Sequence, residues 1–233
     1  MKAVLAPHLG AKDILLGSRQ ELMRDARFLE PRILKAFLSR DGIYQLALGA
    51  LRRKNWREAL NKTFKHRYKR AYGLSSSVHP PAVDIRDAFP LEWSSYFRFC
   101  FVRNPYERVV SDYLYLSRKL ADPPSFSRYL QNLAETGRDL HGRTKHDNWP
   151  MYTIENHLAV DFVGRYENLA TDFQEVGRLI GLPDLALTAS EKRRTYRKPW
   201  RDYYGPGDVD RVGTLYQKEI EAFGYRFEHT PAR

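Results

Sequence analysis

Cysteine is almost absent from this chain of 233 residues. The one cysteine, Cys100, excludes a disulfide within the chain. Cys100 lies in a run of aromatic and aliphatic residues, so we interpret it as a small core side chain rather than a nucleophile. The seven histidines, among them His8, His146 and His157, do not show the spacing of a metal site. We therefore expect no metal cofactor.

Long hydrophobic runs are also absent. No apolar segment reaches the length of about 20 residues that a membrane-spanning helix needs. The N-terminus lacks the charged segment and apolar core that are typical of a secretory signal. We therefore expect a bacterial-type soluble protein, cytoplasmic and without a transmembrane segment. The length predicts a single domain over residues 1–233.

Positive charge is in excess. The chain has 39 Lys and Arg against 28 Asp and Glu, a formal net charge of +11. This excess predicts an anionic partner: a nucleic acid, an anionic lipid at a membrane periphery, a sulfated or uronic-acid glycan, or a nucleotide cosubstrate. The most basic stretch, residues 52–70, fits either a solvated helix or a docking surface for a polyanion. No nucleic-acid-binding signature accompanies it, so we do not expect DNA binding.

The segment YFRFCFVRNPYERVVSDYLYL, residues 96–116, is the most informative part of the chain. Its aromatic and β-branched first part predicts a strand covered on both faces. Asn104 then suits a helix N-cap, Pro105 suits the first helical position, and Glu107 places negative charge in the first turn. Arg103 directly precedes the cap. An arginine beside the N–H groups of a helix N-terminus favours phosphate binding. The plainer alternative is a βα unit with a solvent-facing arginine.

Other patterns predict the remaining elements. Apolar spacing and turn residues favour helices over residues 1–8, 18–72, 84–89, 125–136, 171–180 and 208–222, and short strands over residues 13–16 and 160–163. Thr171 and Gln174 have the spacing of a capping box, and Gly181 is suited to end that helix. Loops are expected over residues 75–81 and 137–150.

Three segments in order, FVRNPYERVVSDY, DFVGRYENLATDF and YQKEIEAFGYRFE, resemble the sulfotransferase-2 family of carbohydrate-type sulfotransferases. These enzymes use 3′-phosphoadenosine-5′-phosphosulfate (PAPS) as cosubstrate. The resemblance implies an α/β fold like that of P-loop NTPases, with a central parallel sheet flanked by helices. It also implies transfer of a sulfuryl group from PAPS to a hydroxyl of an anionic or neutral glycan. The family's arginine and serine that hold the 3′-phosphate fall on Arg103 and Ser111.

The resemblance suggests roles for three further residues. His79 lies in a loop where some members place a catalytic base, and an imidazole suits that task. Arg194 and Arg201 lie in a basic loop that resembles one closing over the nucleotide, although a solvated loop is an equal alternative. Glu167 and Asn168 match a family signature at a strand end, and we expect no catalytic role for them.

The sequence departs from the family in one respect. It contains no PKTGGTS-like segment, the loop that cradles the 5′-phosphosulfate. Residues 1–18 look like the first helix after that loop and its exit, so we expect the chain to begin just past the loop, to lack the first strand and to show little turnover. Two alternatives stay open: a non-catalytic remnant that binds a 3′-phosphonucleotide or an anionic glycan, and a basic nucleic-acid-binding protein.

Overall fold

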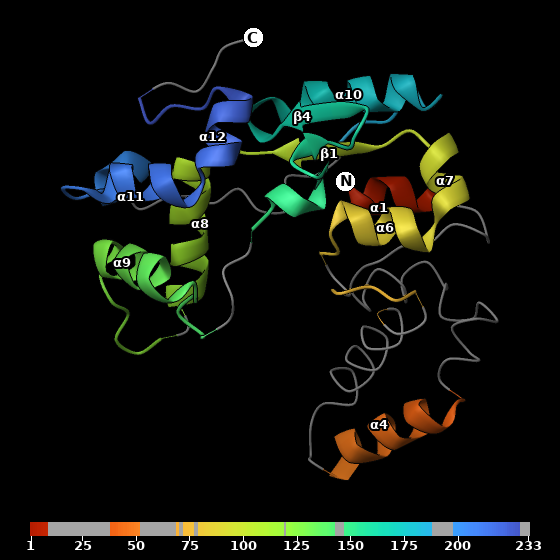
Figure 1. The fold of residues 1–233 in the computed structure, drawn as a ribbon, viewed down its shortest axis with the longest axis horizontal. Helices are drawn as coiled ribbons and strands as arrows, with labels where there is room; N and C mark the ends of the chain where they lie inside the picture. The colour runs from red at the N-terminus through yellow and green to blue at the C-terminus, as the bar shows by residue number, and fades with distance from the viewer. Residues whose placement is uncertain are drawn as a thin grey trace. The chain divides into compact units, whose positions relative to one another are not determined.

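The structure, a computed structural model, describes residues 1–8, 38–51, 69, 72–76, 79–118, 120–142, 147–187 and 198–228. The chain divides into two compact units. Figure 1 labels the helices and strands of both. The first unit comprises Met1–Arg98, Pro150–Asp161 and Phe173–Thr188, and the second comprises Phe99–Trp149, Phe162–Asp172 and Ala189–Arg233. The single domain expected over residues 1–233 stays a prediction.

A two-stranded parallel sheet belongs to the second unit. Strand β1 (Phe99–Val102) pairs with β4 (Phe162–Arg165), and every paired residue is 63 positions from its partner. The register depends on Gly164, because a Cβ there would lie 2.5 Å from the Phe101 ring. The α/β class and a small parallel sheet are thus confirmed. The strand predicted over residues 160–163 begins two residues later, and β1 is only partly buried over three of its four residues, less than predicted.

Helix α8 (Pro105–Ser117) follows β1 and contributes four of the ten buried residues of the hydrophobic core cluster in the described part of the chain. Its apolar face packs with α9 (Phe126–Thr136) and α11 (Asp208–Leu215) around fully buried side chains: Val109, Val110, Leu130 and Val212. The N-cap predicted for α8 is confirmed, since the Asn104 side chain accepts a hydrogen bond from the Tyr106 N–H. Helix α9 is capped in the same way by Ser125, which accepts a hydrogen bond from the Arg128 N–H.

Two predicted helices require correction. The helix expected at 171–180 is α10 (Leu169–Leu179), which continues from the 3-10 turn η4 (Tyr166–Asn168). Thr171 and Gln174 therefore lie inside the helix and do not form its N-terminal box. The helix expected at 208–222 is two helices, α11 and α12 (Gln217–Phe223). The chain leaves helical geometry at Tyr216, where φ is −127° and ψ is 26°.

The first unit contains short helices and a hairpin. Besides most of α10, its described elements are α1 (Lys2–Leu5), η1 (Ala6–His8), α4 (Arg40–Leu51), α6 (Ala82–Ala88), α7 (Pro90–Ser95), β2 (Thr153–Ile154) and β3 (His157–Leu158). The hairpin lies beyond the end of the loop expected at 137–150 and was not predicted. It turns through Glu155 and Asn156 with φ of 52° and 64°, values that favour glycine or asparagine. The strand expected at 13–16 lies outside the described residues.

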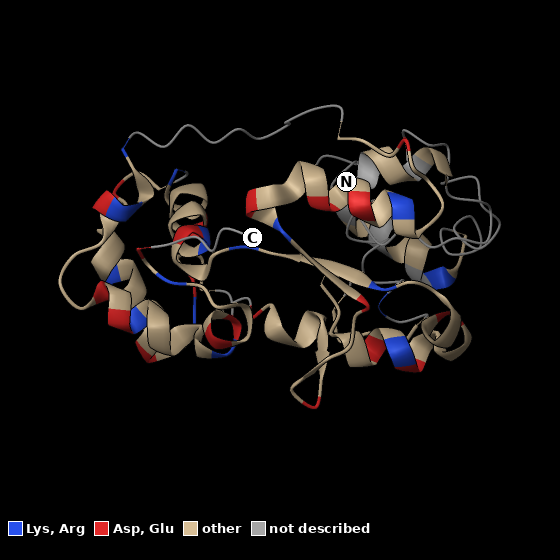
Figure 2. Cartoon of the chain, turned by 90° about the horizontal axis from the view of Figure 1, so that it is seen from above, with Lys and Arg blue, Asp and Glu red and all other residues tan. Residues whose placement is uncertain are grey.

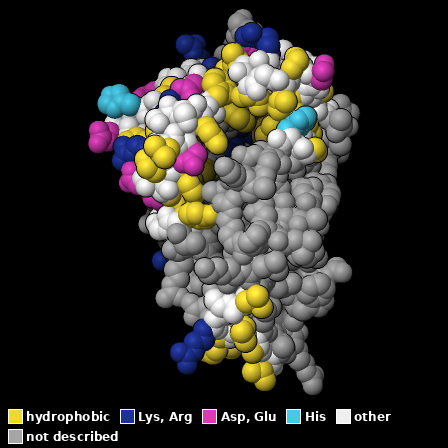
Figure 3. All heavy atoms as spheres, turned by 90° about the vertical axis from the view of Figure 1, so that its right-hand side faces the viewer, with side chains coloured by type: hydrophobic (Ala, Val, Ile, Leu, Met, Phe, Trp, Pro, Cys, Tyr) yellow, Lys and Arg dark blue, Asp and Glu magenta, His cyan; other side chains and the backbone are white. Residues whose placement is uncertain are grey.

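Helix α4 exposes large apolar side chains within a region that was predicted to be helical. Ile43 is 57% and Tyr44 63% exposed. Figure 3 shows the hydrophobic side chains of this helix in yellow near the bottom of the view. Apart from residues 38–51, 69 and 72, the region predicted as helix over 18–72 lies outside the described residues. Among the described helices, none is long and apolar enough to cross a membrane.

A buried ion pair ties α8 to α12. The Arg108 guanidinium donates to both carboxylate oxygens of Glu219 at 2.8 and 2.5 Å and lies 4.8 Å from the centre of the Tyr216 ring. Burial alone would lower the pKa of Arg108, but the Glu219 carboxylate more than offsets it, so this pKa is raised. Elsewhere on the described helices, acidic and basic residues are interspersed (Figure 2).

Burial also changes the chemistry of the one cysteine. Desolvation, with a smaller contribution from the Glu219 carboxylate, raises the pKa of Cys100 to about 12. The thiol therefore keeps its proton at neutral pH. Because the thiolate is the reactive form, this supports the interpretation of Cys100 as a packing residue.

The Arg108–Glu219 pair predicts that a single conservative substitution strongly lowers the stability of the fold. Glu219→Gln keeps the side-chain volume but leaves the buried Arg108 guanidinium without its counter-charge. We expect the free energy of unfolding to fall by about 3 kcal/mol, measured by urea titration followed by circular dichroism. Glu221→Gln, on the exposed side of the same helix, is the matched control and should change it by less than about 0.5 kcal/mol. Equal losses in the two variants would contradict a stabilising role for the buried pair.

Candidate functional site

Arg103 lies between the end of β1 and the N-cap of α8, and its side chain runs along that helix. Its Nη2 is 2.5 Å from Glu107 Oε1, and its Nη1 donates to Ser111 Oγ at 3.4 Å. Glu107 and Ser111 are four residues apart and therefore occupy successive turns on one face of the helix. The guanidinium also stacks on Tyr166, 4.6 Å from the ring centre. The structure thus brings Arg103 and Ser111 together, both largely buried.

The turn that carries Arg103 is held by Glu167. Oε1 of this carboxylate accepts a hydrogen bond from the Asn104 N–H at 2.7 Å, and Oε2 accepts one from the Tyr225 hydroxyl at 3.2 Å. The Asn104 side chain in turn donates to the Arg226 carbonyl at 3.3 Å. Asn104 is fully buried, so its polar groups need these partners. Desolvation, with a further contribution from Glu167, raises the pKa of Tyr225 and keeps it a donor.

These contacts change the expected chemistry of the turn. The sequence predicted that N–H groups at the start of the helix would help to bind phosphate. The Asn104 N–H is instead bonded to Glu167, the Tyr106 N–H is bonded to the Asn104 side chain, and Pro105 has no N–H. The N–H groups of Asn104 and Tyr106 are therefore already bonded within the chain, and a role in phosphate binding for Arg103 and Ser111 stays a prediction.

Arg201 lies in the 3-10 turn η5 (Trp200–Tyr203), also within the second unit. Its side chain is exposed, stacks on Trp200 and donates from Nε to the Phe227 carbonyl at 3.1 Å. These contacts do not connect it to Arg103 or Ser111, so a role in nucleotide binding stays a prediction. Arg194, the other predicted arginine, lies outside the described residues.

His79 belongs to the first unit. It is exposed, and its backbone N–H donates to Ser76 Oγ at 3.3 Å, inside the predicted loop. The same loop is tied to α6 through Ser75, whose N–H and hydroxyl both donate to Asp84. The catalytic role of His79 stays a prediction.

An aromatic cluster that the sequence patterns did not reveal anchors the loop of Arg201 to α8. Tyr204 donates to the Tyr106 carbonyl at 2.7 Å, and its ring contacts Phe227, 4.8 Å between ring centres. Burial raises the pKa of Tyr204, so its hydroxyl stays a donor. A signal was present in the sequence, because WRDYY supplies aromatic residues beside a basic loop. The partner on α8, Tyr106, lies 98 residues before Tyr204, a separation that local patterns do not show.

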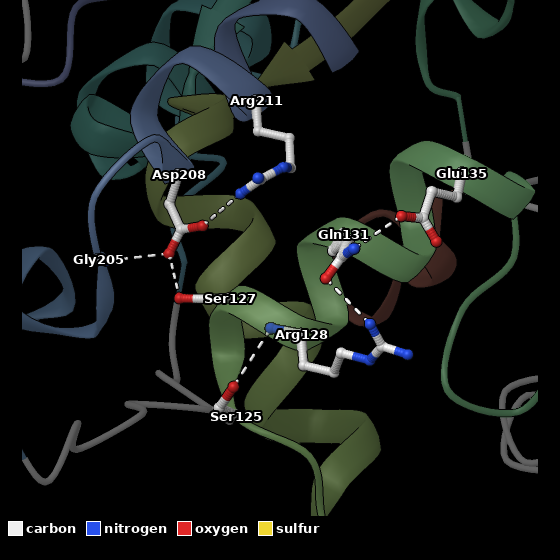
Figure 4. Close-up of polar contacts among 8 residues, drawn as sticks. All are labelled: Ser125, Ser127, Arg128, Gln131, Glu135, Gly205, Asp208 and Arg211. Atoms are coloured by element: carbon white, nitrogen blue, oxygen red, sulfur yellow. Dashed lines mark hydrogen bonds and ion pairs between the residues drawn. The ribbon is translucent and has the colours of Figure 1, made fainter.

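A buried carboxylate fixes the end of that loop. Asp208 is fully buried and accepts hydrogen bonds from Ser127 Oγ at 2.5 Å, the Gly205 N–H at 2.9 Å and Arg211 Nη1 at 2.8 Å (Figure 4). The network joins the start of α11 to α9. Because Asp208 is fully buried and bonded to both α9 and the Gly205 backbone, we interpret it as a structural residue.

Comparison with known proteins identifies the family. The family profile Sulfotransfer_2, described as the sulfotransferase family, matches residues 86–226, more than half of the chain. The chain therefore belongs to this family, as the motifs indicated, and this supports a sulfotransferase-like function and a transferase enzyme. The matched range includes Arg103, Ser111 and Glu167, whereas His79 precedes it.

The chain is also similar to an uncharacterized protein of Archaeoglobus fulgidus. The two are 37% identical over 98 residues, which is 40% of this chain and 73% of the archaeal protein. No solved structure matches this chain.

The contacts of Glu167 predict how the turn responds to its removal. Glu167→Ala leaves the buried Asn104 N–H without its acceptor. We expect the free energy of unfolding to fall by about 2 kcal/mol and the Asn104 amide to exchange its hydrogen faster, measured by nuclear magnetic resonance. Glu167→Gln keeps an acceptor oxygen and should lose less than half as much. Unchanged protection of Asn104 in Glu167→Ala would show that the turn is held by other contacts.

Proposed function

We propose that the second unit binds the 3′-phosphate of PAPS, and of its product 3′,5′-ADP, through Arg103 and Ser111. The observation that carries the proposal is the placement of Arg103, just after β1, with its Nη1 3.4 Å from the Ser111 Oγ on α8. Family membership supports it, because sulfotransferases generally use this nucleotide as sulfate donor.

The chemistry of the two groups suits a phosphate monoester. A guanidinium presents parallel N–H donors that match phosphate oxygens, and a serine hydroxyl adds a neutral donor that can rotate to suit. Stacking on Tyr166 restricts the guanidinium plane, which lowers the entropy lost on binding. Glu167 holds the backbone of the turn that carries Arg103, so this arginine is positioned before the phosphate binds.

The proposed reaction is in-line transfer of the sulfuryl group. The acceptor hydroxyl oxygen forms a bond to sulfur while the bond from sulfur to the 5′-phosphate oxygen breaks, which releases 3′,5′-ADP. A base must take the hydroxyl proton, and His79 is our candidate. A hydroxyl of a carbohydrate is the proposed acceptor. The net charge of +11 favours an anionic glycan, and a neutral one remains an alternative.

The second candidate function is binding without catalysis. The sequence has no PKTGGTS-like segment, so donors for the 5′-phosphosulfate are not evident from it. Under this alternative, the chain binds the nucleotide but does not transfer a sulfuryl group. Nucleotide titration and a transfer assay separate the two candidates.

Calorimetric titration with 3′,5′-ADP tests the proposed site. We expect Arg103→Ala to weaken binding at least 30-fold, about 2 kcal/mol, because a charge-assisted hydrogen bond is lost. Ser111→Ala should weaken it several-fold. Arg178→Ala, which removes an exposed arginine paired with Glu175, is the matched control. Its affinity should match that of the unchanged chain at 0.15 M salt, where distant surface charges are screened.

Circular dichroism of each variant checks that the fold survives. Equal binding by folded Arg103→Ala would refute the placement of the 3′-phosphate, and no binding by the unchanged chain would refute the proposed function.

A transfer assay with PAPS and a panel of glycans tests the proposed base. We expect a low rate, and we expect His79→Ala to lower it by about 10²-fold while the dissociation constant for 3′,5′-ADP stays within twofold. His157→Ala, an exposed histidine in the β2–β3 hairpin, is the matched control and should keep the full rate. A rate unaffected by His79→Ala would show that another group takes the proton.

A further inference from the structure

The Arg103 guanidinium is paired with an anion from its own helix. Glu107 Oε1 lies 2.5 Å from Arg103 Nη2, and the two side chains are only 17% and 22% exposed. Partial burial strengthens the pair, because fewer water molecules screen it. An external phosphate would therefore not meet an unoccupied arginine.

The positions of Glu107 and Ser111 make the competition direct. Both lie on the face of α8 along which Arg103 runs, one helical turn apart, and each contacts a different terminal nitrogen of the guanidinium. A phosphate that bonds both Arg103 and Ser111 must approach the carboxylate of Glu107. The phosphate and the Glu107 carboxylate would then repel each other strongly, because the site is partly buried.

We propose that Glu107 is a built-in competitor for the 3′-phosphate site. Its carboxylate holds Arg103 in the free protein and leaves the guanidinium when a phosphate binds. The 22% exposure of Glu107 leaves it a route to solvent, and its place in the first turn of α8 remains favourable after the exchange. This inference rests on the proposed function, because it concerns the same phosphate.

The exchange would give the site a preference among anions. A ligand binds only if it interacts with Arg103 and Ser111 more favourably than Glu107 interacts with Arg103. A phosphate monoester, with nearly two negative charges and three oxygens, meets that condition better than a monoanion does. Selectivity of this kind comes from a penalty on weak ligands rather than from an added contact with the right one.

The test is a calorimetric titration of three proteins with two nucleotides. Glu107→Gln removes the competing charge and keeps the side-chain size. Glu175→Gln removes the same charge from an exposed arginine pair on α10 and is the matched control. We expect Glu107→Gln to bind 3′,5′-ADP about tenfold more tightly, 1.4 kcal/mol. The control should match the unchanged chain. With 5′-AMP, which lacks the 3′-phosphate, the gain should disappear.

Each outcome decides the question. A gain confined to Glu107→Gln and to 3′,5′-ADP supports the exchange. Binding by Glu107→Gln with none by the unchanged chain overturns the proposed function and, with it, the exchange. Equal or weaker binding by Glu107→Gln, with normal binding by the unchanged chain, overturns the exchange and leaves the proposed function standing. Such a result would make Glu107 a residue that orients Arg103. No binding by any of the three proteins overturns both proposals.

Discussion

The parallel register of β1 and β4 is the constraint on which the candidate site depends. Partners in the sheet are 63 residues apart, and the same separation joins Arg103 to Tyr166 and Asn104 to Glu167 just beyond the strands. The register thus continues past the sheet and decides which side chain meets which. A slip of one residue would turn each side chain to the opposite face and remove Glu167 from the Asn104 N–H.

Two carboxylates of the chain bond to polar groups of the turn at Arg103 and Asn104, one to the backbone and one to a side chain. Glu167 comes from the 3-10 turn η4 that follows β4 and bonds to the backbone, where it fixes the geometry. Glu107 comes from the same helix and bonds to the side chain of Arg103, where a ligand could replace it. These separate roles suit a site in which the backbone stays fixed while the anion bound to Arg103 is exchanged. They also explain how a largely buried arginine is compatible with a stable fold.

Local signals in the sequence predicted the elements around the site well. Asn104 caps α8 as expected, because a cap depends on a few adjacent residues. Local signals failed where contacts between residues far apart in the sequence determine the backbone conformation. The break at Tyr216 interrupts an otherwise helical pattern, and Tyr216 packs beside the buried Arg108–Glu219 pair. The β2–β3 hairpin lacks the usual Asn-Gly signal for its turn.

The site itself was only partly predictable. The pairing of Arg103 with Ser111 came from resemblance to a family, whereas the role of Glu167 could not be read from a sequence that separates it from Asn104 by 63 residues. The Arg103–Glu107 ion pair could have been predicted, because a spacing of four residues is typical of ion pairs along a helix. It was interpreted only as first-turn charge, because the direction of the Arg103 side chain was unknown.

A crystal structure of the chain with 3′,5′-ADP would show directly whether the phosphate replaces Glu107 at Arg103. We expect the 3′-phosphate within hydrogen-bond distance of the Arg103 guanidinium and Ser111 Oγ, with the Glu107 carboxylate turned away and the Asn104 N–H still bonded to Glu167. A nucleotide bound elsewhere, with Arg103 still paired to Glu107, would contradict both the site and the exchange.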